Sequence, residues 1–194
     1  MAAGRDPLAC AFFLIGALTL AGLLHTAWMR SSVSQRFAVP LDGGYTIRGR
    51  RLFGDNKTVR GFMAMVPGAG LTFFALALMI GPGATSDSLW ALSPLGYAAL
   101  GILAGLGFML GELPNSFVKR QLDIAPGRPP RGRLAALACF VVDRLDSILG
   151  MLAAVSLAVP TSWRTWIYVI VLGPAIHWSF SLLLFRLGVK ARPA

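Results

Sequence analysis

Long runs of apolar residues, separated by short polar connections, make up most of the chain. A helix that crosses a hydrocarbon core of about 30 Å needs roughly 20 mostly apolar residues, because each residue adds about 1.5 Å of length. The sequence contains five runs of about this length. We therefore predict a single membrane domain over residues 1–194, with transmembrane helices at about 8–28, 61–80, 94–113, 134–159 and 165–185.

Composition supports this prediction. Of the 194 residues, 56% are hydrophobic and only 13% are charged, and the mean hydropathy is +0.67. A soluble domain of this length is much less apolar. The expected fold class is an all-α integral membrane protein, a five-transmembrane-helix bundle. Gly101 and Gly105, and likewise Gly107 and Gly111, are small residues four apart that permit close helix packing.

Basic residues gather on one predicted side of the membrane. The chain has 18 Lys and Arg against 8 Asp and Glu, a net charge of +10. Fifteen of these basic residues lie in 29–60, in 114–133 and after residue 185, whereas two lie in the other connections. Because cytoplasmic loops carry excess Lys and Arg, we predict an external N-terminus and two basic cytoplasmic loops, 29–60 and 114–133, in the cell (inner) membrane. A basic surface also suits the phosphates of nucleotides or lipid head groups.

Three charged residues interrupt the fourth apolar run, within "CFVVDRLDSILG" at 139–150. Charges at bilayer depth are costly and usually face a bundle interior or a wet cavity. Asp143 and Asp146 share one helical face with side-chain roots roughly 5–6 Å apart, which suits a hard cation such as Mg²⁺. Arg144, about 100° round the helix, would keep the carboxylates ionised or meet a phosphate. The alternative is an Asp–Arg pair that only locks the bundle.

The first predicted loop contains "LDGGYTIRGRRLFGDNKTVRG" at 41–61, in which glycines alternate with basic residues. Glycine lets backbone N–H groups approach a ligand, and basic side chains supply charge for phosphates. The stretch is not a Walker A loop, because Asp55 and Asn56 follow Gly54 where Gly-Lys-Ser/Thr is required. A solvated loop near anionic lipid is the alternative.

The second predicted loop follows Glu112 and reads "GELPNSFVKRQLDIAPGRPPRGR" over 111–133. If residues 115–120 form a helical turn, Ser116, Lys119 and Arg120 lie on one side of it. They could then face the aspartates of the fourth apolar run.

The stretches "GDNKTVRG", "GELPNSFVKR" and "DRLDSILG", in this order and spacing, resemble the CDP-archaeol synthase family and, more distantly, the CTP:phosphatidate cytidylyltransferases. The similarity covers about residues 40–150. It implies a small bundle whose site faces the cytoplasm. It also implies a Mg²⁺-dependent enzyme of phospholipid biosynthesis that condenses CTP with phosphatidate or an archaeal-type ether lipid phosphate, giving CDP-activated lipid and pyrophosphate. The excess of Arg over Lys, fifteen against three, suggests a GC-rich coding sequence and a bacterial source.

The resemblance also implies roles for particular residues. Asp143 and Asp146 are expected to bind metal, with Glu112 as a further ligand and a second cation left open. Lys119 and Arg144 complete the expected catalytic set. The expected partners are CTP, a lipid phosphate and the surrounding lipids, without nucleic acid and with a homodimer left open. The substrate-binding candidates are Asn56, Lys57, Thr58, Arg60, Asn115, Ser116 and Arg120.

Two other functions fit part of the pattern. A small ion- or proton-coupled transporter would also place acids within helices, but it would not need two loops rich in glycine and basic residues on one side. A CDP-alcohol phosphotransferase would use the product of the implied reaction, but its D-G-x-x-A-R signature is missing. The transporter remains the alternative function at this point.

Overall fold

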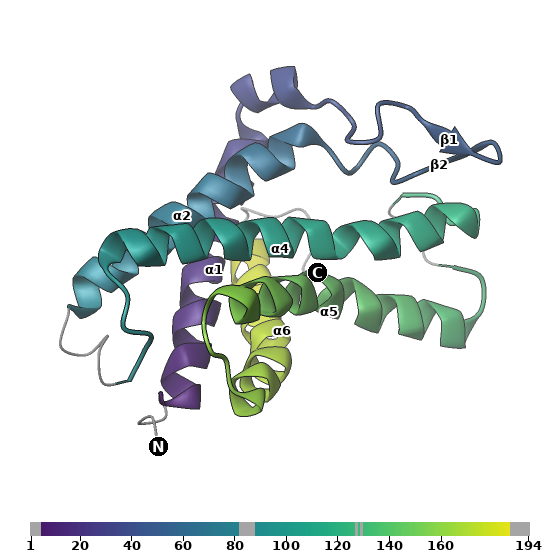
Figure 1. The fold of residues 1–194 in the computed structure, drawn as a ribbon. Coiled ribbons are helices and arrows are strands. Elements are labelled where there is room, and N and C mark those ends of the chain that lie inside the picture. The colour runs from purple at the N-terminus through teal and green to yellow at the C-terminus, as the bar shows by residue number, and fades with distance from the viewer. Residues whose placement is uncertain (1–4, 82–87, 127, 129, 187–194) are drawn as a thin grey trace.

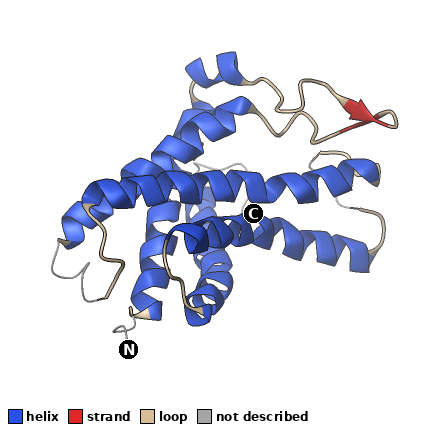
Figure 2. Cartoon of the chain, viewed as in Figure 1, coloured by secondary structure: helices blue, strands red, loops and turns tan. Residues whose placement is uncertain are grey.

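The structure is a computed structural model that describes residues 5–81, 88–126, 128 and 130–186, without the side chains of 177, 180, 181 and 183–185. The described residues form five long helices (Figure 1), and a short hairpin is the only strand structure among them (Figure 2). The long helices are α1 (Pro7–Arg30), α2 (Val59–Ile80), α4 (Pro94–Gln121), α5 (Arg133–Ala158) and α6 (Trp163–Arg186). The loop between α1 and α2 contains the 3-10 helix η1 (Val33–Phe37) and the strands β1 (Thr46–Ile47) and β2 (Arg50–Arg51).

The prediction of an all-α fold with five helices is confirmed. Among the described residues, α1, α2 and α4 are long and apolar enough to cross a membrane, and α6 has a shorter apolar part at Trp163–Ile176. Helix α5 has sufficient length, but Asp143, Arg144 and Asp146 interrupt its apolar sequence. The crossing of the membrane by all five helices, the sidedness of the loops and the single domain stay predictions.

The third helix extends beyond the membrane span predicted at about 94–113, and that span itself stays a prediction. Helix α4 continues through Pro114 to Gln121, so the first eight residues of the predicted second loop are helical. Proline removes one backbone hydrogen bond from a helix, but the turns after Pro114 are held by side-chain contacts with α5 and with the hairpin. Lys119 and Arg120 lie in the last turn, where cations interact favourably with the helix dipole.

The five helices pack as a closed ring in the order α1, α2, α4, α5, α6, with α6 against α1. Figure 1 shows α2 crossing α4, and α5 running beside α4. One end of the ring contains the C-terminal end of α1, the N-terminal end of α2, the C-terminal part of α4 and the N-terminal part of α5. We call this the polar end, because the charged residues discussed below lie there.

The apolar core lies toward the opposite end. The ring of Phe13 is edge-on to that of Phe73, with centroids 5.2 Å apart. The connection before α4 is tied into this core, since Trp90 Nε1 donates to the Pro160 carbonyl at 2.9 Å. Every helix contributes a fully or almost fully buried apolar side chain, for example Phe13, Phe73, Tyr97, Met151 and Val169.

Helices α4 and α5 touch through their backbones. A Cβ atom added at Gly150 would lie 2.3 Å from the carbonyl oxygen of Gly107, and one at Gly111 would lie 2.4 Å from that of Asp146. On the α2 side, a Cβ at Gly101 would lie 2.5 Å from the Ala69 carbonyl oxygen. The two predicted glycine pairs therefore do permit close packing, and they do so against two different helices.

Candidate active site

The two aspartates of α5 converge on one side chain of α4. Asn115 Nδ2 donates to Asp143 Oδ1 at 2.6 Å and to Asp146 Oδ2 at 2.7 Å. A carboxamide nitrogen carries two hydrogens, so both are used. Asp143 and Asp146 therefore share a face of α5, as their spacing predicts, and that face is turned toward α4.

Two lysines and a third carboxylate extend this arrangement. Lys119 Nζ pairs with Asp143, and Lys57 Nζ pairs with Glu112. Ser147 Oγ donates to Glu112 Oε1 at 2.7 Å and lies 3.2 Å from Asp146 Oδ1. We call this continuous set the polar cluster; its members are Lys57, Glu112, Asn115, Lys119, Asp143, Asp146 and Ser147.

The charges of the polar cluster do not balance. Three carboxylates face two ammonium groups, which leaves one negative charge in excess. Carboxylates that lie close together repel one another, so an excess of them favours the binding of a cation. The cluster can therefore accept a cation between its carboxylates, while its lysines can meet an anion.

The glycine contact explains why such short side chains can reach one another. Gly111 directly precedes Glu112, and Gly150 follows Ser147 by less than one helical turn. Close backbone approach at these glycines brings the flanking turns of α4 and α5 within the reach of Asn and Asp side chains. The spacing within the polar cluster is thus set by the two helix backbones.

Four other predicted site residues make no hydrogen bond or ion pair with Asp143 or Asp146 in the described part of the chain. The Arg144 guanidinium stacks 3.4 Å from the Phe140 ring centroid, and its Nη1 donates to the Phe140 carbonyl at 3.3 Å. Within the described part of the chain, Arg144 thus contacts Phe140 rather than a carboxylate. Thr58 is buried at the N-terminus of α2, Ser116 is buried on α4, and Asn56 is exposed.

Two predicted phosphate-binding arginines lie close to the loop between α1 and α2. Arg60 belongs to the first turn of α2, and two of its guanidinium nitrogens are buried without a hydrogen-bond partner in the described protein. Arg120 donates from Nη1 to the Ile124 carbonyl. Its Cδ lies 3.3 Å from where a Cβ at Gly54 would be, and Gly54 has φ +83°. The loop can approach Arg120 here because residue 54 is glycine.

Asp42, which no sequence pattern selected, organises the loop between α1 and α2. Its carboxylate is 0% exposed. It accepts hydrogen bonds from the backbone N–H groups of Gly44, Phe53 and Gly54 at 3.0–3.1 Å, and from Arg51 Nε at 3.2 Å. The Arg51 hydrogen bond, with the backbone N–H groups, holds the pKa of Asp42 well below its usual range. This part of the loop is therefore folded around a buried charge.

We expect Asp42→Asn to accelerate tryptic cleavage within residues 48–57 by about tenfold or more, since hydrogen bonds to a charged group contribute about 1.5–3 kcal/mol each. Because folding lowers this pKa, the stabilisation is present above the unfolded value of about 4 and is lost only as the pH falls through the folded value. Asp42 therefore stays ionised near neutral pH. A change of pH in that range should not alter the rate of tryptic cleavage of the unaltered protein through this group. Asp55→Asn, which alters a 75% exposed partner of Arg51, is the control; equal cleavage of both variants would contradict the prediction.

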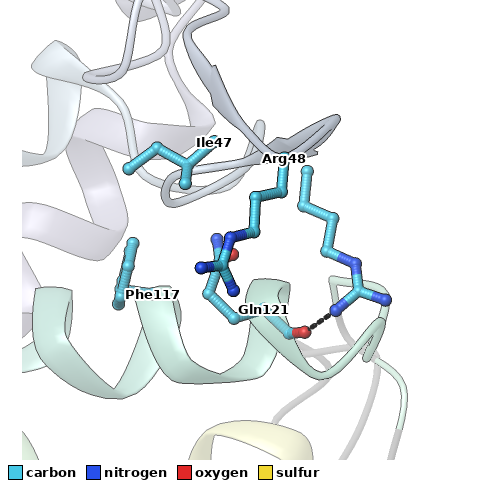
Figure 3. Close-up of a pocket in the computed structure, with 5 residues that line it drawn as sticks. Ile47, Arg48, Phe117 and Gln121 are labelled. Carbon is cyan, nitrogen blue, oxygen red and sulfur yellow. Dashed lines mark hydrogen bonds between the residues drawn. The ribbon is translucent and has the colours of Figure 1, made fainter.

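A cavity of about 590 Å³ lies between the hairpin and α4 (Figure 3). The hairpin is fastened to the end of α4 because Arg50 donates to the Gln121 carbonyl and pairs with Asp123. Residues 117 and 121 are about 200° round the helix from residues 115 and 119. The cavity and the polar cluster therefore lie on opposite sides of α4. The lining residues are Ile47, Arg48, Arg50, Phe117 and Gln121.

A bundle of apolar helices with a carboxylate and ammonium cluster at one end is a form suited to a membrane-embedded enzyme. The CarS-like family, described as CDP-archaeol synthase, matches residues 12–193. The chain belongs to this family. It is an enzyme of lipid biosynthesis, a cytidylyltransferase and an integral membrane protein, and the transporter alternative finds no support.

Individual relatives support this family assignment. The CDP-archaeol synthase of Halobacterium salinarum is 38% identical over 162 residues, which cover 79% of this chain and 82% of that protein. That of Thermococcus kodakarensis is 31% identical over 155 residues, 79% and 81% of the two chains. A solved structure titled "Structural insight into an intramembrane enzyme for archaeal membrane lipids biosynthesis" has a TM-score of 0.64 and 25% identity, covering 91% of this chain and 95% of that one. These relatives do not test the predicted bacterial source, which stays a prediction.

Proposed function

We propose that the chain transfers the cytidylyl group of CTP to an archaeal-type ether lipid phosphate, with release of pyrophosphate. The observation that carries this proposal is the convergence of Asp143 and Asp146 on Asn115, with lysines at either end of the polar cluster. Such an arrangement offers both a place for a cation and positive charge for phosphates. The names of the relatives supply the substrate class.

The proposed reaction is a direct transfer between the two substrates. An oxygen of the lipid phosphate attacks the α-phosphorus of CTP, and the bond from this phosphorus to the oxygen bridging to the β-phosphorus breaks. Pyrophosphate leaves with the electron pair. Because the nucleophile is already an anion, no general base is required. Phosphoryl-type transfer depends mainly on positioning and on neutralisation of charge, which Lys57 and Lys119 are placed to provide.

The carboxylates suit Mg²⁺, which usually binds one or two carboxylates together with water and substrate phosphates. No group of three or more His, Cys, Asp or Glu in the described ranges is arranged to hold a metal ion. Asp143 and Asp146 would hold the ion as a pair, because both carboxylates converge on Asn115, whereas Glu112 joins the cluster through Ser147 and Lys57. When bound, Mg²⁺ would neutralise phosphate charge and polarise the phosphorus under attack. The other residues orient the substrates around it.

The proposal predicts pyrophosphate release by the purified protein in detergent with CTP, Mg²⁺ and unsaturated archaetidic acid. EDTA should abolish this release and excess Mg²⁺ should restore it, because two aspartates alone would leave the phosphate charge unscreened. Dioleoyl phosphatidate in a parallel reaction measures lipid preference, and omission of lipid is the control. Absence of pyrophosphate with both lipids, from protein that elutes as a single folded species, would refute the proposal.

A further inference from the structure

Five buried side-chain nitrogens in the described part of the chain have no hydrogen-bond partner, and no buried side-chain oxygen there shares this property. A buried donor left unpaired costs about 1–3 kcal/mol, and more when it is charged, so such atoms are few in native proteins. The guanidinium and indole nitrogens can only donate, and the imidazole nitrogen can donate in one tautomer, so the set suits a partner that accepts hydrogen bonds. The five atoms are His25 Nε2, Trp28 Nε1, Arg60 Nε and Nη1, and Arg120 Nε.

Three of these residues lie where α1 meets α2. His25 and Trp28 are three residues apart on α1 and so share one face of that helix. A Cβ atom at Gly61, the residue after Arg60, would lie 3.8 Å from His25 Nε2, so the imidazole lies against the first turn of α2. We call His25, Trp28 and Arg60 the α1–α2 donor group.

The donor group adjoins the polar cluster. His25 lies against the first turn of α2, the helix that begins two residues after Lys57 of the polar cluster. Glu112 in turn pairs with Lys57 and, through Ser147, adjoins Asp146. The donor group and the two aspartates thus lie on either side of Glu112. Two phosphate-bearing substrates could occupy these two sides and meet between them.

We propose that His25 and Arg60 bind the phosphate of the lipid substrate. An imidazole can donate from Nε2, and a guanidinium presents several donors in a fixed plane that suits phosphate oxygens. This inference rests on the proposed function, since it assigns one of the two substrates to a place. Sequence reasoning assigned Arg60 to phosphate but did not select His25.

The position of the donor group favours the lipid over CTP. Leu24, the neighbour of His25, is 46% exposed on an apolar helix surface, where lipid chains can run along α1. The donor group lies near the end of α1, and Trp28 is of the residue type that settles at the membrane–water interface. A lipid phosphate sits at that depth, and its tails need no passage through the bundle. The aspartates and lysines of the polar cluster remain for the triphosphate.

The test compares four variants by the KM for each substrate, with dihexanoyl phosphatidate or its short-chain ether analogue as the lipid. His25→Phe keeps a ring but removes the donor, and Arg60→Gln removes the charge. Each should raise the KM for lipid phosphate about tenfold or more and leave the KM for CTP within about twofold. His25→Gln, which retains an N–H donor, should stay close to the unaltered protein. Arg36→Gln, an exposed arginine of η1, is the matched control.

A binding measurement separates this inference from the proposed function. Without CTP, the short-chain lipid phosphate should raise the Tm of the unaltered protein and of Arg36→Gln, but not that of Arg60→Gln or His25→Phe. Arg60→Lys replaces Arg60→Gln if the latter aggregates. If no pyrophosphate forms but the Tm shift follows this pattern, the proposed function fails and the phosphate site stands. If turnover occurs and the variants alter the KM for CTP, or neither KM, the inference is overturned.

Discussion

Asp143→Asn and Asp146→Asn should each reduce kcat for pyrophosphate release by at least about 100-fold, the usual effect of removing one electrostatic contact from a transition state. Each variant deletes one negative charge from the pair that would hold Mg²⁺ against the triphosphate. Asparagine keeps the shape of the side chain and still offers an oxygen to Asn115. The fold should therefore persist while the cation site is lost.

The control is Asp123→Asn. Asp123 is a 67% exposed carboxylate that pairs with Arg50 at the end of α4, outside the polar cluster. Its loss should leave kcat within about twofold, since exposed ion pairs contribute little. Retention of more than a tenth of the activity by Asp146→Asn would contradict this prediction and would indicate that the aspartates have a structural role only. Size-exclusion elution and Tm, compared across the three variants, show whether a loss of activity reflects unfolding.

Gly150→Ala, although it adds one methyl group, should destabilise the bundle by about 3 kcal/mol or more and abolish activity. The new Cβ would lie 2.3 Å from the Gly107 carbonyl oxygen and 2.6 Å from Gly111 Cα. Both are backbone atoms, so no side chain can rotate away and α4 must move from α5. Overpacking typically costs about 1–3 kcal/mol even where side chains can adjust. The same movement separates Asn115 from the aspartates.

Gly16→Ala is the matched control for Gly150→Ala. It makes the same change within a helix, α1, and a Cβ there would meet nothing within 4 Å. Its Tm should equal that of the unaltered protein or exceed it slightly, because alanine favours helix more than glycine does. The measurement is thermal unfolding in detergent followed by intrinsic fluorescence, with pyrophosphate release assayed on the same samples. Unchanged Tm and activity in Gly150→Ala would disprove the close contact.

The sequence was most informative about the helices. A long hydrophobic run predicts a helix that is removed from water. This prediction does not depend on which neighbour the helix packs against. The end of α4 does depend on neighbours. The apolar run ends near Leu113 and does not show how far the helix itself continues, whereas contacts of Asn115 and Lys119 with α5 accompany its continuation to Gln121. Those contacts join residues too distant in sequence to be read from a pattern.

The candidate site could be predicted only where a residue differs clearly from its neighbours in the sequence. Asp143 and Asp146 stand out because charge within an apolar run is costly. Asp42 does not stand out, because its partners are mostly backbone N–H groups that any sequence possesses. His25 offered a usable signal, since it is also a titratable residue within an apolar run. The predicted 100° offset of Arg144 from the aspartates does not reveal the partner of its side chain. In the structure that partner is Phe140.

The closure of the ring by α1 and α6 has a consequence for how the protein is made. Thr165 Oγ1 lies 3.3 Å from the Pro7 carbonyl oxygen, although 158 positions separate the two residues. During translation α2, α4 and α5 can each pack against the helix made just before, whereas α1 must wait for α6 until synthesis is nearly complete. The polar cluster and the α1–α2 donor group contain no residue of α6. Every residue of the proposed reaction centre has therefore been synthesised before α6 is complete.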